Sequence, residues 1–102
     1  MSIIEIKSAS QFDEELSTNE LVIIYYTAKW CRAIGPAVRV LGEDNPSVIF
    51  LKVDIDLVSD HPLVKSVTSL PHFVSRKNGV EIEEFTGASP DNLKKMIAEL
   101  VK

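Results

Sequence analysis

Cysteine is nearly absent from this chain, whose 102 residues contain only Cys31. A single thiol excludes a disulfide within the chain and any zinc site built from several cysteines. Long hydrophobic runs are also missing, since the longest, LVIIYY at residues 21–26, is far too short to cross a bilayer. We expect no membrane partner, no metal and no cofactor.

The sequence also lacks a basic stripe, and its net charge is -4 with a pI near 5.1. This charge argues against nucleic acid or an anionic membrane surface as a partner. The first ten residues, MSIIEIKSAS, have no basic region, no long apolar region and no cleavage site of the secretory type. We expect a cytoplasmic protein, in which a lone thiol normally stays reduced.

The length suits one domain covering residues 1–102, and no repeat or low-complexity segment interrupts it. The periodicity of apolar residues alternates between strand and helix patterns. Strands are expected at residues 3–6, 21–27, 47–55, 72–76 and 80–85, and helices at 8–16, 33–43, 62–65 and 89–101. This order predicts an α/β domain with a mixed sheet and a late antiparallel hairpin.

Local signals predict how some of these elements begin. Ser89, followed by a proline, is a good N-cap for the last helix. The short helix at 62–65 is expected to be capped by Ser59 or Asp60. In the hairpin, Asn78 and Gly79 supply the positive-φ residues that a tight turn needs, and the alternation of Val80 and Ile82 predicts one buried face.

The stretches AKWC, RAIGP, KVDID, VTSLPHF, KNG and FTGAS occur in an order that resembles thioredoxin over nearly the whole chain. The resemblance implies a thioredoxin-like fold, with a central mixed β-sheet flanked by helices and a cis-proline, Pro71, before the fourth strand. It also implies a groove that binds client polypeptides in an extended form, in the manner of strand addition. Its residues would be Trp30, Leu70, Pro71, Gly87 and Ala88.

The chemistry of that family needs two cysteines, in the pattern Trp-Cys-x-x-Cys. The first attacks a client disulfide, and the second resolves the mixed disulfide that results. Here Trp30 and Cys31 are followed directly by RAIGP, as if three residues were deleted. The sequence leaves open whether Cys31 corresponds to the first or the second cysteine. A three-residue loss shifts a helix by about 4.5 Å, so we expect a shortened active-site helix with Pro36 in its first turn.

A second departure from the family lies on the strand before the motif. Tyr25 occupies the position of a buried aspartate that assists proton transfer in the family. Lys52 matches the family's lysine on the neighbouring strand. Without its acid, this lysine is expected either to bond to the Tyr25 hydroxyl group or to extend outward to solvent.

Each candidate residue has a structural alternative to its functional interpretation. Cys31 is either a nucleophile that forms mixed disulfides or a leftover thiol in a small apolar site. His72 is either its partner in a Cys-His pair or a strand histidine near the surface, and we favour the second. Trp30 contacts clients or packs locally. The aspartates between residues 54 and 60 fit a strand end and a helix cap better than a cation site.

The leading hypothesis is a divergent thioredoxin that cannot run dithiol-disulfide exchange and retains the polypeptide-binding groove. One alternative is a monothiol redox protein that forms mixed disulfides through Cys31, resolved by glutathione or a client. Another is a natural or engineered active-site deletion variant. The expected partners are client polypeptides or protein thiols and disulfides, with glutathione and thioredoxin reductase left open. We expect a monomer, and a Cys31-linked dimer under oxidation stays open, as does enzymatic activity.

Overall fold

The computed structural model describes residues 3–31 and 33–102. In these residues one mixed sheet contains β1 (Ile3–Ile6), β2 (Leu21–Thr27), β3 (Ile49–Asp54), β4 (His72–Lys77) and β5 (Val80–Thr86), in the spatial order β1-β3-β2-β4-β5. The first three strands are parallel, and β4 and β5 are antiparallel to their neighbours. The helices are α1 (Ala9–Thr18), α2 (Gly35–Asp44), α3 (Pro62–Lys65) and α4 (Pro90–Leu100). The predicted order of elements is confirmed.

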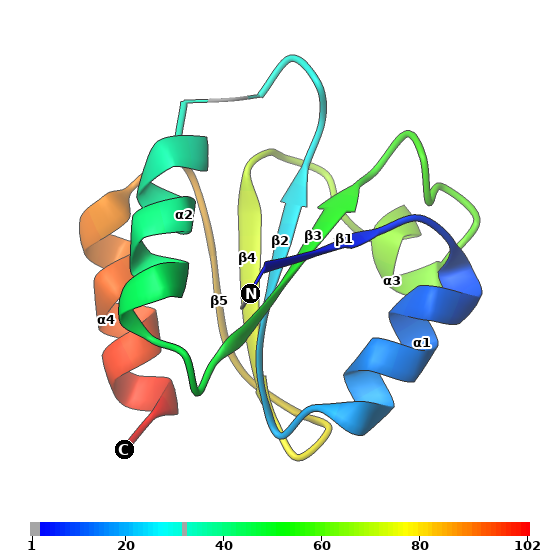
Figure 1. The fold of residues 1–102 in the computed structure, drawn as a ribbon. Coiled ribbons are helices and arrows are strands. Elements are labelled where there is room, and N and C mark those ends of the chain that lie inside the picture. Colours follow the sequence, from blue (N-terminus) through cyan, green and yellow to red (C-terminus); the bar gives the residue numbers. More distant parts are fainter. Residues whose placement is uncertain (1–2, 32) are drawn as a thin grey trace.

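The helices cover both faces of the sheet, with α2 and α4 on one face and α1 and α3 on the other (Figure 1). Alternate residues of a strand point to opposite faces. Accordingly, Tyr25 of β2 joins the core under α2 and α4, whereas Tyr26 joins the core under α1 and α3. The strand β2 is therefore buried on both faces. In the described part of the chain, no helix is long and apolar enough to span a membrane.

The core under α2 and α4 contains apolar residues that lie three or four positions apart along each helix. From α2 and its N-cap it contains Ile34, Val38 and Leu41, and from α4 it contains Leu93, Met96, Ile97 and Leu100. The helix predicted at residues 33–43 begins two residues later, at Gly35, and ends at Asp44. Pro36 lies in its first turn, as expected, where a missing N–H group costs little.

The predicted cap of α3 is wrong, because the N-cap is His61 rather than Ser59 or Asp60. The His61 Nδ1 atom accepts a hydrogen bond from the Leu63 backbone N–H group at 3.1 Å. Its ring is buried, lies 4.6 Å from the Phe12 ring, and bonds through Nε2 to Asp13 at 2.7 Å. Contacts with α1 therefore position the cap, and such contacts are invisible in the local sequence.

The hairpin between β4 and β5 turns at Asn78 and Gly79, which have positive φ values of 52° and 83°. These conformations confirm the predicted tight turn. The predicted burial of Val80 and Ile82 is wrong, since they are 61% and 48% exposed. The strand β5 lies at the edge of the sheet, and only Phe85 packs against the core from this strand.

Candidate functional site

Three loops meet at one end of the sheet. Tyr26, near the carboxyl end of β2, pairs with His72, the first residue of β4, and His72 pairs with Thr86 at the end of β5. The loop after β2, the segment before β4 and the loop after β5 therefore lie at the same end (Figure 1). These segments carry the residues predicted for client binding, which are Trp30, Leu70, Pro71, Gly87 and Ala88.

The segment before β4 is tied to the loop after β5. The Leu70–Pro71 peptide bond is cis, and the Pro71 carbonyl group accepts a hydrogen bond from the Gly87 N–H group at 2.9 Å. Gly87 has a φ of 120°, a conformation that side chains other than hydrogen strongly disfavour. Within the described residues, no hydrogen bond is formed by the Leu70 backbone. The Leu70 amide and carbonyl groups therefore have no hydrogen-bond partner among the described residues.

Trp30 lies in the loop between β2 and α2 and is the chain's only tryptophan. Its side chain is 74% exposed, more than any other large apolar residue that the structure describes. Ala28, two residues earlier, is buried. The structure therefore places the indole ring in solvent and not in the core, which argues against local packing as its role.

Cys31 is half-buried in the same loop. Its N–H group donates to the Ala28 carbonyl group, and its carbonyl group accepts from the Thr27 hydroxyl group, both at 2.9 Å. The helix α2 begins four residues later, so Cys31 lies outside its first turn. Cys31 lines a cavity of about 270 Å³ together with Tyr25, Thr27, Ala28, Lys29, Gly35, Lys52 and Asp54.

Tyr25 is buried, and its ring stacks on Phe73 with the ring centres 5.0 Å apart. Burial raises the pKa of Tyr25, although a hydrogen bond with Thr27 acts in the opposite direction. Lys52 lies opposite Tyr25 on β3, but its ammonium group is 3.7 Å from the Glu5 carboxylate and its side chain is 43% exposed. Of the two expected arrangements for Lys52, the structure shows the outward one.

His72 does not pair with Cys31. Its Nδ1 atom is 2.8 Å from the Thr86 hydroxyl group, and its ring stacks on Tyr26. Tyr26 belongs to the α1 and α3 side of the sheet, whereas the cavity beside Cys31 includes Tyr25 from the α2 side. The Cys-His alternative is therefore wrong, and the favoured interpretation as a strand histidine near the surface agrees with the structure.

The thioredoxin family model matches residues 3–99 of this chain. The chain belongs to the thioredoxin family. It is 33% identical to putative thioredoxin-5 of Dictyostelium discoideum, over 95% of this chain and 97% of that protein. It is 38% identical to the TPR repeat-containing thioredoxin TDX of Oryza sativa subsp. japonica, over 95% of this chain, but spans only 33% of that longer relative.

Solved thioredoxin structures confirm the fold. A cysteine-to-serine mutant of Entamoeba histolytica thioredoxin has a TM-score of 0.88 and 32% identity, covering 95% of this chain and 98% of that one. Plasmodium falciparum thioredoxin has a TM-score of 0.87 and 34% identity, covering 93% and 96%. Against this background, the single cysteine marks a disrupted Trp-Cys-x-x-Cys motif.

The aspartates after β3 organise a turn in this thioredoxin-family chain. The Asp54 carboxylate accepts hydrogen bonds from the N–H groups of Asp56 at 2.9 Å and Leu57 at 3.3 Å. Among the described residues, no three or more histidine, cysteine or acidic side chains converge as metal ligands. The aspartates therefore fit the predicted strand end, although the helix cap falls to His61.

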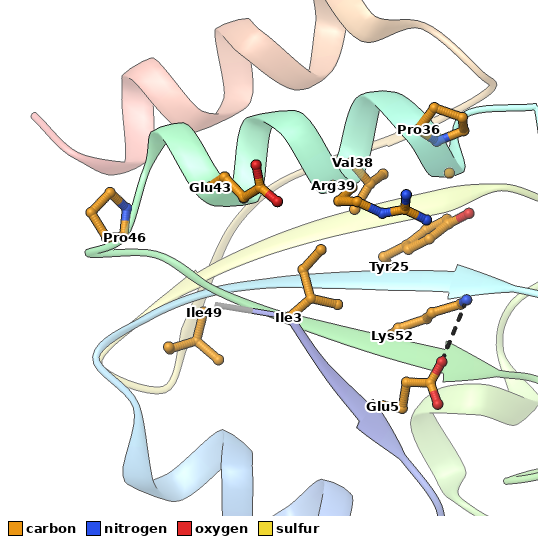
Figure 2. Close-up of a pocket in the computed structure, with 12 residues that line it drawn as sticks. Ile3, Glu5, Tyr25, Pro36, Val38, Arg39, Glu43, Pro46, Ile49 and Lys52 are labelled. Atoms are coloured by element: carbon orange, nitrogen blue, oxygen red, sulfur yellow. Dashed lines mark ion pairs between the residues drawn. The ribbon is translucent and has the colours of Figure 1, made fainter. Parts of the chain in front are cut away.

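Sequence reasoning missed a second, larger cavity of about 880 Å³ between α2 and the β1–β3 side of the sheet (Figure 2). Its lining combines Glu5 of β1 and Lys52 of β3 with Arg39 of α2. Glu5 and Lys52 are brought together by the parallel register of β1 and β3. No local pattern signals this site, because its residues are far apart in the sequence.

Proposed function

We propose that this chain is a polypeptide-binding member of the thioredoxin family that does not run dithiol-disulfide exchange. The observation that carries the proposal is the single cysteine. A mixed disulfide between Cys31 and a client has no second thiol in the same chain to resolve it. Tyr25 supports the proposal, because a buried phenol with a raised pKa does not accept a proton at neutral pH as a carboxylate does.

The binding half of the proposal is supported by the end of the sheet that carries Trp30 and Pro71. An extended polypeptide needs backbone partners, and the Leu70 amide and carbonyl groups are available within the described residues. It also needs apolar contact, and the exposed Trp30 ring offers a large apolar surface with one hydrogen-bond donor. Neither contribution depends on the Cys31 thiol.

Reduction of insulin disulfides by thioredoxin reductase and NADPH tests the loss of exchange. A thioredoxin that carries both cysteines serves as the positive control. We expect insulin turnover with this chain to equal the blank without any thioredoxin. Turnover close to that of the two-cysteine control would overturn the proposal.

A monothiol exchanger is the second candidate, favoured by the half-buried Cys31 at the edge of a cavity. Its thiolate would attack a client disulfide and release one client thiolate, leaving a mixed disulfide. Glutathione thiolate would then attack the client sulfur and release the Cys31 thiolate. A second glutathione would free the client thiol as glutathione disulfide forms, so that two glutathione molecules supply the two electrons.

The two candidates separate when glutathione is the only reductant. Client reduction that requires glutathione and disappears in Cys31→Ser supports the monothiol exchanger. If wild type and Cys31→Ser do not differ, the thiol is incidental and the binding function stands alone. Thiol alkylation with iodoacetamide gives an independent readout of whether Cys31 is accessible.

A further inference from the structure

The cavity of about 880 Å³ lies on the α2 side of the sheet and is separate from the end that carries Trp30 and Pro71. Its size falls in the range of pockets that hold small organic ligands. The strand β1 forms the edge of the sheet here, and its Ile3 is only partly buried. The space above this edge is therefore open rather than filled by core side chains.

One end of the cavity gathers hydrogen-bond donors. Figure 2 shows the Arg39 guanidinium group, the Tyr25 hydroxyl group and the Lys52 ammonium group at this end. Among the described residues, Arg39 forms no salt bridge. Lys52 is 3.7 Å from Glu5, which is too long for a good hydrogen bond. Arg39 therefore has no acidic partner to give up, whereas Lys52 keeps its ion pair with Glu5 and can direct its remaining N–H groups to a new carboxylate.

The rest of the cavity is lined mainly by apolar side chains and one acid, Glu43. Ile3 and Val38 line its middle, and Glu43 and Pro46 line its other end (Figure 2). Glu43 is one helical turn beyond Arg39, about 6 Å along the axis. A second anionic group would be repelled by Glu43, whereas an apolar body is accommodated by Ile3 and Val38. The lining carries two acids, Glu5 and Glu43, and two cations, Arg39 and Lys52, and only Arg39 of these cations has no acidic partner among the described residues. One carboxylate can therefore be held between Arg39 and Lys52 while Lys52 keeps Glu5.

We propose that this cavity binds a small monocarboxylate with an apolar body. The carboxylate contacts Arg39 and Lys52, and the body lies over Ile3 and Val38. The inference does not rest on the proposed polypeptide-binding function, because no residue of the Trp30 and Pro71 end takes part.

A larger side chain at Gly35 can be used to block the cavity of about 880 Å³. This cavity shares Tyr25, Gly35 and Lys52 with the smaller cavity beside Cys31. A Cβ atom placed on Gly35 meets no other atom within 4 Å, so a side chain fits there without strain. Because Gly35 lines both cavities, Gly35→Leu adds a bulky group to the wall that they share, and Gly35→Ala is its matched control.

The test is a titration of isotope-labelled full-length protein with octanoate, octylammonium and octanol, followed by backbone amide shifts. Each probe contains eight carbon atoms, so the apolar tails differ by at most one methylene and the main difference is the head group. We expect saturable shifts at Ile3, Val38 and Lys52 with octanoate, and binding at least about fivefold weaker for the other two probes. Arg39→Gln and Lys52→Gln should each weaken the binding of octanoate by about threefold or more. The affinity for octanol should not change in either variant.

Gly35→Leu should abolish the octanoate shifts, while Gly35→Ala retains them. Unchanged amide shifts elsewhere in the spectrum confirm that each variant is folded. The proposal is overturned if octanoate fails to saturate, if all three probes bind equally, or if the shifts map to Trp30 and the exposed β5 strand instead. Octanoate binding that both charge-removing variants retain unchanged would also overturn it.

Discussion

The helices α2 and α4 pack on the same face of the sheet but begin in different ways. At α4, the Ser89 side chain accepts a hydrogen bond from the Asn92 N–H group at 3.2 Å, and Pro90 follows. At α2, the N-cap position is held by Ile34, whose side chain makes no capping hydrogen bond and is buried in the core. One helix is started by polar capping and the other by apolar burial.

The way in which α2 begins matters for the chemistry of the thiol, because α2 follows the loop that carries Cys31. In the family pattern, the reactive cysteine lies near the N-terminus of this helix, where the helix dipole and amide groups favour a thiolate. Here the helix begins at Gly35, four residues after Cys31. The start of α2 is therefore fixed by how Ile34 fits the core, and not by an arrangement around the thiol.

The largest change in stability is expected from Leu93→Ala in α4. Leu93 is fully buried, so the substitution should lower the free energy of unfolding by about 2–5 kcal/mol. Urea denaturation measured by circular dichroism checks this value. Leu57→Ala, at a residue that is 56% exposed, is the control and should change stability little. Equal effects at the two sites would contradict the assignment of the core.

Ile34→Ser tests the start of α2 directly. Serine is a better capping residue and should contribute about 1 kcal/mol, but losing the buried isoleucine costs about 1.5–3 kcal/mol before any cavity is counted. We therefore expect a net loss of about 0.5–2 kcal/mol in the free energy of unfolding before any cavity is counted. A variant as stable as the wild type would show that the missing cap, and not apolar burial, limits this helix.

Ser89→Ala tests the start of α4. Loss of the capping hydrogen bond should lower the free energy of unfolding by about 1 kcal/mol. Ser89→Asp preserves a capping oxygen and is the matched control. If both variants lose the same stability, the hydroxyl group is not acting as a cap.

The smallest change in stability is expected from Gly35→Ala at the first residue of α2. A Cβ atom there meets no other atom within 4 Å, so the alanine should stabilise the helix by up to about 0.5–1 kcal/mol. Thermal unfolding, compared with the wild type in the same buffer, measures this gain. A loss of stability would mean that the backbone at Gly35 is less helical than the structure shows.

Local sequence signals predict much of this fold but only part of the site. The turn at Asn78–Gly79 and the cap at Ser89 depend on neighbouring residues, and both are correct. The cap at His61 depends on packing against α1, and local reasoning chose the wrong residues. Exposure of Val80 was missed for a related reason, because alternation along a strand does not reveal that the strand lies at an edge.

The same distinction applies to the candidate site. The thioredoxin resemblance correctly indicated that Trp30, Pro71 and Gly87 lie in loops that meet at one end of the sheet. The disfavoured pairing of His72 with Cys31 does not form, since the His72 ring stacks on Tyr26 whereas Cys31 lines a cavity that includes Tyr25. The outward direction of Lys52 required knowledge of the register between β1 and β3, which no local pattern provides.

Polypeptide is expected to bind at Trp30 without help from the Cys31 thiol. Trp30 is the only tryptophan, so its fluorescence reports on this surface alone. The decisive measurement is a titration of wild type and Cys31→Ser with a synthetic extended peptide that lacks tryptophan and cysteine. We predict the same saturable blue shift of Trp30 emission in both proteins. Saturable binding that leaves Trp30 emission unchanged, or a shift that Cys31→Ser abolishes, would contradict the account.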